Sequence, residues 1–344
     1  MTGSIGGSGG RWLVRDDLAA AAGTATGLLL ASPDAGSVVT LSPADHELTA
    51  AALTAAGVGP ADRVVVALAE PAGALWASAA AEVAAAAAAV GPRGRLRLQH
   101  LLTTLRATTL VTTPTGAMDL LARLHLEFLL DPLDLGLRQI VVTGEIAAPH
   151  TLAHLAAEFE ATVTEVYASP FSGAALAWRS AAADPLTPLR DGLVRHAALA
   201  KDEFAAEGRG ELVLVREDAV LRTGQVAAQP GAAPAHTVGE HLLVRGVWLS
   251  LPRLDKALAR IDGVAAWDLT VSRPGTLDVA VLTVRYARAG LVGNPMWKAR
   301  VEQALQALTP VRIAVEIDPE VAPRGAGVVT DLRGQHLGRD RALV

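Results

Sequence analysis

Residues 140–170, IVVTGEIAAPHTLAHLAAEFEATVTEVYASP, decide the fold of this chain. The β-branched run at 140–143 predicts a buried strand, and a similar run at 162–167 predicts a second one. Between them Pro149 suits the first turn of a helix, and we expect that helix over 149–158. A strand, a helix and another strand at these lengths form a βαβ unit, which makes the two strands parallel.

The same alternation of strands and helices extends from about residue 37 to 225. β-Branched runs alternate there with alanine-rich stretches of helical length, which is typical of a mostly parallel sheet. The additional strands are expected at 64–68 and 109–112, and the additional helices at 75–89, 98–106 and 117–124.

The pattern changes after residues 229–236, QPGAAPAH, a Pro-, Gly- and Ala-rich stretch typical of a linker. Beyond it, the order of elements predicts a compact α+β unit with an antiparallel sheet. We therefore expect a large N-terminal α/β domain over 1–238 and a small C-terminal α+β domain over 239–344. The smaller domain should hold a hairpin at 242–249, helices at 252–261 and 295–308, and strands at 266–272, 278–285 and 311–317.

Composition sets limits on the function classes to consider. The 344 residues suffice for two cores of unequal size, and 51% hydrophobic residues with 19% charged ones indicate a folded protein. A net charge of −5 leaves no basic footprint for nucleic acid. The absence of cysteine excludes disulfides, thiol catalysis and cysteine zinc sites. The longest apolar run, at 77–90, is interrupted by Glu82 and too short to span a bilayer. We expect a cytoplasmic protein without membrane or nucleic-acid partners.

Short signatures in a fixed order suggest a family. They are TGEIA at 143–147, EVYASP at 165–170, GELVL at 210–214, LRTGQ at 221–225, LVRGVWL at 243–249, APRG at 322–325 and DLR at 331–333. In this order and with these gaps, the chain resembles the phenylacetate–coenzyme A ligase branch of the adenylate-forming (acyl-CoA synthetase) superfamily. The resemblance implies a large α/β domain that holds the nucleotide and acyl sites, with the small C-terminal α+β domain as a lid.

The resemblance also implies which residues line the ligand cleft. The segments around 143–147 and 165–170 wall the nucleotide pocket in that family, and the loop at 243–249 belongs to the lid. The acyl group lies beside the same strand-to-helix segments and the one that includes Trp76. The implied ligand-binding residues are Trp76, Thr143, Gly144, Glu145, Tyr167, Ser169, Phe171, Gln225, Arg245, Gly246 and Trp248.

Four features that such enzymes use for ATP are missing here. The phosphate loop would fall at 34–40, DAGSVVT, which keeps one glycine, lacks the lysine and begins with an acidic residue, Asp34. Phe171 stands where a magnesium-linked glutamate belongs, and a benzyl group cannot bind a hard cation. Gln225 replaces the ribose-binding aspartate, and no lysine follows Arg324. Loss of one preorganised electrostatic group costs about 10²–10³ in rate, so four losses leave little adenylation.

We therefore expect no resident cofactor and assign no catalytic residue. His150, His154 and Glu158 fall on one face of the helix at 149–158, but such a stripe is typical of a solvated surface, so no metal is expected.

Several functions are compatible with the sequence. The first hypothesis is a ligase-like protein of a biosynthetic pathway that binds a small acyl or aryl carboxylate, a thioester or a protein partner in the inherited cleft. An active ATP-dependent carboxylate–CoA ligase with rebuilt motifs is the alternative, and ATP, magnesium and CoA would then be its cofactors. Acyl transfer from a preformed thioester is a third. Whether the protein is an enzyme stays open, and a homodimer is compatible with each reading.

Overall fold

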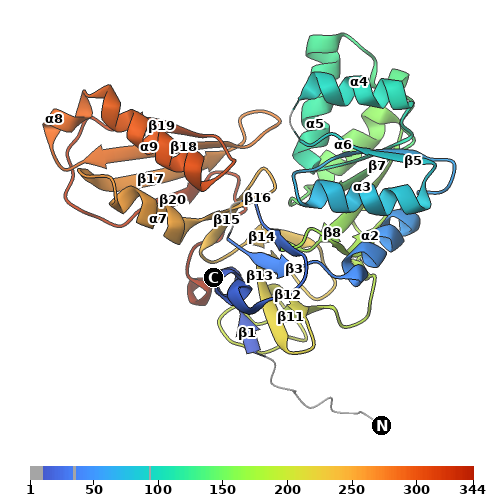
Figure 1. Ribbon diagram of the computed structural model, residues 1–344, viewed down its shortest axis with the longest axis horizontal. Coiled ribbons are helices and arrows are strands. Elements are labelled where there is room, and N and C mark those ends of the chain that lie inside the picture. The colour runs from blue at the N-terminus through green and yellow to red at the C-terminus, as the bar shows by residue number, and fades with distance from the viewer. Residues whose placement is uncertain (1–10, 34–35, 93) are drawn as a thin grey trace.

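The computed structural model describes residues 11–33, 36–92 and 94–344. The polypeptide forms a larger body and a smaller lid that lie side by side (Figure 1). Helices and strands alternate along the body, and the lid packs helices on one sheet. The α/β class expected from the sequence is confirmed.

A seven-stranded sheet forms the centre of the body, in the order β10-β9-β8-β7-β6-β4-β5. Its strands β4, β5, β6, β7 and β8 pair in parallel, as the βαβ pattern predicts. The strands are β4 (Arg63–Ala67), β5 (Ala86–Ala89), β6 (Thr109–Thr112), β7 (Gln139–Thr143), β8 (Thr162–Ala168), and the antiparallel β9 (Ala175–Arg179) and β10 (Thr187–Pro188).

Helices cover both faces of this sheet because each helix has one apolar side. One core contains Leu102, Leu120 and Leu155 from three helices, packed with Leu110 and Ile140 of the sheet. The opposite core contains residues of two helices on the other face of the same strands. The helices are α2 (Pro43–Ala55), α3 (Ala72–Val83), α4 (Arg95–Leu105), α5 (Pro114–Arg123) and α6 (Pro149–Phe159), with helical turns η2 (Leu124–Phe128) and η3 (Pro132–Leu135).

The helix expected over 75–89 is wrong at its C-terminal end. Helix α3 stops at Val83, and Ala86–Ala89 instead forms strand β5, which pairs in parallel with β4. Alanine has the highest helix propensity, so the local sequence favours a longer helix. The backbone N–H and C=O groups of these alanines bond instead to the open edge of β4. The local sequence pattern does not show that this edge is available.

A second sheet joins the body to the lid. It contains β1 (Arg11–Leu13), β11 (Val194–Ala197), β12 (Gly210–Val215), β13 (Ala219–Ala227) and β14 (Pro234–Thr237). The stretch at 229–236 predicted as a linker thus ends in a strand, because Pro234–Thr237 pairs with the edge of β13. Four further elements come before α2 in the sequence. They are α1 (Arg15–Ala21), the turn η1 (Ala22–Thr24), β2 (Leu29–Ala31) and β3 (Val38–Thr40).

The lid has a core of its own, built from residues between Leu242 and Val329. Its four-stranded sheet has the order β19-β18-β17-β20, and the outer pairs are parallel, so the expectation of an antiparallel sheet holds only for β17 and β18. The expected boundary at residue 238 falls between β14 and β15. The elements of the lid are β15 (His241–Val244), β16 (Val247–Ser250), α7 (Leu251–Ala259), β17 (Val264–Ser272), β18 (Val279–Tyr286), α8 (Ala289–Val292), α9 (Pro295–Leu308), β19 (Ile313–Ile317), β20 (Val328–Asp331) and η4 (Arg341–Leu343).

Candidate functional site

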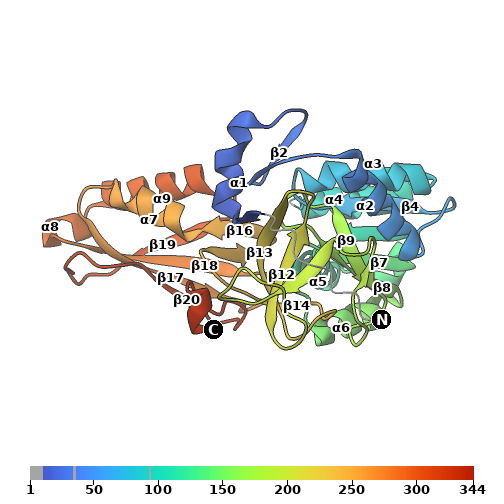
Figure 2. The ribbon, with the colours of Figure 1, turned by 90° about the horizontal axis from the view of Figure 1, so that it is seen from below.

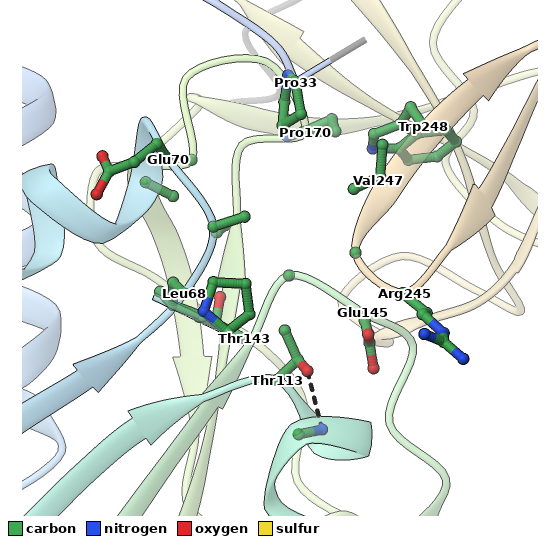
Figure 3. A pocket seen from close by; sticks show the side chains of 18 of the residues that line it. Pro33, Leu68, Glu70, Thr113, Thr143, Glu145, Pro170, Arg245, Val247 and Trp248 are labelled. Atoms are coloured by element: carbon green, nitrogen blue, oxygen red, sulfur yellow. Dashed lines mark hydrogen bonds between the residues drawn. The ribbon is translucent and has the colours of Figure 1, made fainter. Parts of the chain in front are cut away.

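A cavity of about 500 Å³ lies at the C-terminal ends of the parallel strands, where the lid meets the body. Its walls come from the segments that follow β4, β6, β7 and β8, and from the β15–β16 hairpin and other parts of the lid (Figure 3). Open α/β sheets bind ligands at this edge, because the loops after the parallel strands converge there.

Every residue that the sequence singled out for the cleft lines this one cavity. The residues come from helix α3, from the ends of β7 and β8, from β13 and from the hairpin turn. They are Trp76, Thr143, Gly144, Glu145, Tyr167, Ser169, Phe171, Gln225, Arg245, Gly246 and Trp248.

The structure adds lining residues that the sequence did not reveal. Thr113, Thr115 and Gly116 follow β6, the strand expected at 109–112, and that position at a strand end was the available signal. Glu70 follows β4, the strand expected at 64–68, and carries the same signal. Other lining residues, in the lid, in helix α4 and before β3, had no local signal. They include Ser32, Pro33, Arg97, Leu277, Pro310 and Arg312.

Glu145 is held by the N-terminus of helix α5. Its Oε1 accepts a hydrogen bond from the Thr115 hydroxyl at 2.9 Å, and its Oε2 accepts one from the Thr115 amide at 3.2 Å. Thr113 caps the same helix by accepting from the Gly116 amide at 3.0 Å, the dashed contact in Figure 3. Burial raises the pKa of Glu145, and the nearby Asp278 carboxylate raises it further. Both carboxyl oxygens of Glu145 are thus engaged by Thr115 at the cavity wall.

The lid closes on the site through the turn between β15 and β16. Gly246 has φ +72°, and a Cβ there would lie 3.6 Å from Thr113 Cγ2 and 3.7 Å from the Gly144 carbonyl oxygen. Arg245 lies beside Glu145 at the cavity edge (Figure 3). Its Nε donates to the Asp278 carbonyl oxygen at 2.6 Å, so the arginine is anchored to the lid. The hairpin turn is therefore in contact with the body.

Three cavity residues carry buried polar atoms that have no hydrogen-bond partner in the described part of the chain. They are Thr143 Oγ1, Tyr167 Oη and Gln225 Oε1, on side chains that are about 3%, 5% and 6% exposed. Burial also raises the pKa of Tyr167, so its phenol stays protonated at neutral pH. An unpaired buried polar atom costs about 1–3 kcal/mol, and a ligand or water in the cavity would remove that cost.

The segment expected at the phosphate loop is only partly described, since Asp34 and Ala35 lie outside the described residues. Its flanks bond to each other: the Ser32 amide donates to the Ser37 carbonyl at 2.9 Å, and the Ser37 amide donates to the Ser32 hydroxyl at 3.0 Å. Beyond Ser37 the chain continues as strand β3. The Ser32 and Ser37 amides are thus engaged within the hairpin.

Arg15 fills the space beside Phe171. Its guanidinium donates to the Ser37 hydroxyl at 3.0 Å and to the Pro170 carbonyl at 2.8 Å. It also lies over the rings of Phe171 and Trp248, at 4.9 and 4.8 Å from their centroids. The residue is about 3% exposed. A cation and an aromatic ring of the chain itself thus occupy the position that the resemblance assigns to a metal ligand.

The remaining expectations concern metals and membranes. No group of three metal-binding side chains occurs among the described residues. His154 and Glu158 lie 3.8 Å apart on the surface of α6, as an ordinary i,i+4 pair. In the same part of the chain, every helix is too short or too polar to cross a membrane.

No family model and no curated protein matches the sequence, whereas several solved structures match the fold. 2-Hydroxyisobutyryl-CoA ligase, in complex with 2-HIB-AMP and CoA in its thioesterification state, matches with TM-score 0.76 and 18% identity, over 93% of this chain and 80% of that one. Amide bond synthetase McbA from Marinactinospora thermotolerans matches with TM-score 0.63 and 17% identity, over 85% and 65%. o-Succinylbenzoate CoA synthetase from Bacillus subtilis matches with TM-score 0.60 and 14% identity, over 87% and 67%.

The hydroxyisobutyryl-CoA ligase also has structures in other states. Its postadenylation state matches with TM-score 0.57, and its open conformation with 0.54. The score thus differs between structures of the same ligase. This protein has the fold of the adenylate-forming acyl-CoA ligases, a large α/β body with a small α+β lid.

Proposed function

We propose that this protein binds a small acyl or aryl carboxylate, or its thioester, in the cavity under the lid and does not form an acyl adenylate from ATP. One observation carries the proposal: the cavity is retained, while Arg15 and Phe171 fill the side where the resemblance places the metal. A hard cation needs oxygen ligands, and a benzyl ring beside a guanidinium supplies none.

The size and walls of the cavity support a small organic ligand. A volume of about 500 Å³ lies within the range of about 300–1,000 Å³ that is usual for ligand pockets. Leu68, Trp76, Val247 and Trp248 provide apolar surface. An aryl ring or a medium-length acyl chain would lie against these walls.

The polar groups of the cavity support a carbonyl-bearing ligand. The Thr143 hydroxyl can donate to a carbonyl oxygen, and Gln225 Oε1 can accept from a hydroxyl or amide. Arg97 and Arg312 line the same cavity and add positive charge for an anionic group.

Acyl transfer from a preformed thioester is a second candidate function. The lid arrangement favours it, because the hydroxyisobutyryl-CoA ligase is more similar to this chain in its thioesterification state than in its postadenylation or open state. A role in a biosynthetic pathway, and descent from the phenylacetate–CoA ligase branch, belong to this proposal and rest on the sequence signatures.

Thermal unfolding with a ligand panel tests the proposal. The panel contains aryl and medium-chain carboxylic acids, their CoA thioesters, free CoA and MgATP. At 100 times Kd a ligand adds ~2.7 kcal/mol to the free energy of unfolding, which raises Tm by several degrees. We expect such a shift with acids or thioesters and none with MgATP. A flat response to every acid and thioester, or a shift with MgATP alone, would contradict it.

A further inference from the structure

We propose that residues 335–341, the C-terminal strap, together with helix α1 fix the lid in one orientation over the cavity. The chain would then function in one arrangement of lid and body, whereas the similar ligase has structures in an open conformation and in a thioesterification state. This inference concerns the position of the lid and does not depend on which ligand the cavity binds.

The strap pairs with the connection between body and lid, residues 237–240. The Thr237 amide donates to the Gln335 carbonyl at 2.7 Å, and the Leu337 amide donates to the Thr237 carbonyl at 2.9 Å. The Gly239 amide donates to the Gly338 carbonyl at 2.9 Å. A hinge works because a few residues change φ and ψ. These backbone bonds must break before the connection can turn.

Two arginines of the strap bind partners on opposite sides of the connection, one in the body and one in the lid. Arg341 Nε donates to Glu211 Oε2 in β12 of the body at 3.1 Å. Arg339 bonds instead to Glu240, at 2.8 Å, and to Asp255 in α7 of the lid, at 3.1 Å. The strap therefore links body to lid on both sides of the connection.

The Arg341 guanidinium also covers the connection itself. Gly239 has φ +94°, a conformation that suits glycine, and a Cβ added there would lie 2.9 Å from the guanidinium carbon. The arginine thus packs against the backbone at the point where a hinge would have to move.

Helix α1 provides a second link between body and lid, some 320 residues away from the strap in sequence. Arg15 bonds to Ser37 and Pro170 of the body and lies over Trp248 of the hairpin. Oδ1 of the neighbouring Asp16 lies 3.3 Å from Nε2 of His241 in β15. Figures 1 and 2 place α1 and the C-terminal end at the junction of body and lid. The hairpin shares the core of the lid, so fixing the hairpin fixes the lid.

Distance measurements between two spin labels test the inference. The sequence contains no cysteine, so Ala51→Cys in α2 and Gln306→Cys in α9, both exposed, can be labelled selectively. In the otherwise unchanged chain we expect one narrow distance, with and without MgATP, free CoA or an acyl thioester. In the strap variant Arg339→Ala/Arg341→Ala we expect the loss of that single distance and the appearance of a second one.

The control removes two exposed arginines of the lid, Arg260 and Arg288, and should keep the single distance. Should the strap variant fail to fold, Arg341→Ala alone is the second variant, because Glu211 keeps its bonds from Arg222 and from the Gly224 amide. Two distances in the unchanged chain would overturn the inference. So would a single narrow distance in a folded strap variant, whatever the ligand panel shows.

Discussion

At the scale of single residues, a substitution of Thr143 distinguishes an effect on ligand binding from an effect on the stability of the ligand-free protein. Its hydroxyl is buried in the cavity wall without a partner in the described chain. Thr143→Val replaces it with a methyl group of similar size, so we expect the ligand-free protein to become more stable, by about 1 kcal/mol. The Tm shift caused by the acid or thioester should shrink, because the ligand loses a hydrogen bond.

Thr109→Val is the matched control for this change. Thr109 carries another buried hydroxyl without a partner in the described chain, on β6 and away from the cavity lining. The Thr109→Val variant should have a higher free energy of unfolding in denaturant. Its Tm shift with the ligand should stay unchanged. Equal ligand shifts in both variants would show that Thr143 does not contact the ligand.

Arg333 is a second residue whose contacts predict a measurable effect. It donates to Asp278 at 2.6 Å, to Asp331 at 2.8 Å and to the Leu243 carbonyl at 2.9 Å. Both carboxylates are buried. Arg333→Met leaves them without this partner, so we expect about 3–5 kcal/mol of destabilisation in denaturant unfolding.

Arg285→Met is the comparison for the Arg333 variant. Arg285 pairs with Asp268 near the lid surface, where each side chain is about one-third exposed. Such pairs contribute about 0–1 kcal/mol. A loss of similar size in both variants would mean that Arg333 does not support the turn that carries Asp278.

At the scale of elements, two histidines make the connection between body and lid sensitive to acid. Burial lowers the pKa of His336 in the strap to about 4 and that of His241 in β15 to about 3. Above pH 6.5 both rings are neutral in folded and unfolded chains, so neither histidine lowers the free energy of unfolding. As the pH falls below 6.5 the unfolded chain binds protons first, so the free energy of unfolding decreases by roughly 1.4 kcal/mol per pH unit and histidine.

Unfolding by denaturant at pH 7.5 and at pH 5 measures this loss. His336→Gln should flatten the pH dependence by removing one of the two contributions. A glutamine at the exposed His100 should leave the dependence unchanged. A slope that is identical in all three proteins would show that protonation of the strap does not control stability.

At the scale of the whole molecule, we expect no ATP–pyrophosphate exchange with any carboxylic acid. The chain holds no lysine after Lys298, and Arg15 packs on Phe171 where a metal would need oxygen ligands. Phe171→Glu restores a carboxylate but not the other missing groups, so it should also show no exchange. Exchange above background in the unchanged protein would establish the alternative of an active adenylate-forming ligase.

Sequence by itself determined the parallel sheet and the group of residues at its edge. β-Branched runs and helix spacing are local patterns, so the strands ending at Thr112 and Thr143 could be predicted within a residue or two. Parallel strands then bring their carboxyl ends together. For this reason the order of strands and helices alone places Thr143, Glu145 and Tyr167 at one edge of the sheet.

Tertiary structure alone decided how the chain closes over that edge. The alanines of β5 favour a helix locally and become a strand only because β4 offers an open edge. Arg15 reaches Phe171 and Trp248, and Arg341 reaches Glu211, across separations of 130 to more than 230 residues. A local pattern reports which face of an element is apolar. It does not report which distant surface will meet that element, because shape and charge of the folded partners determine that contact.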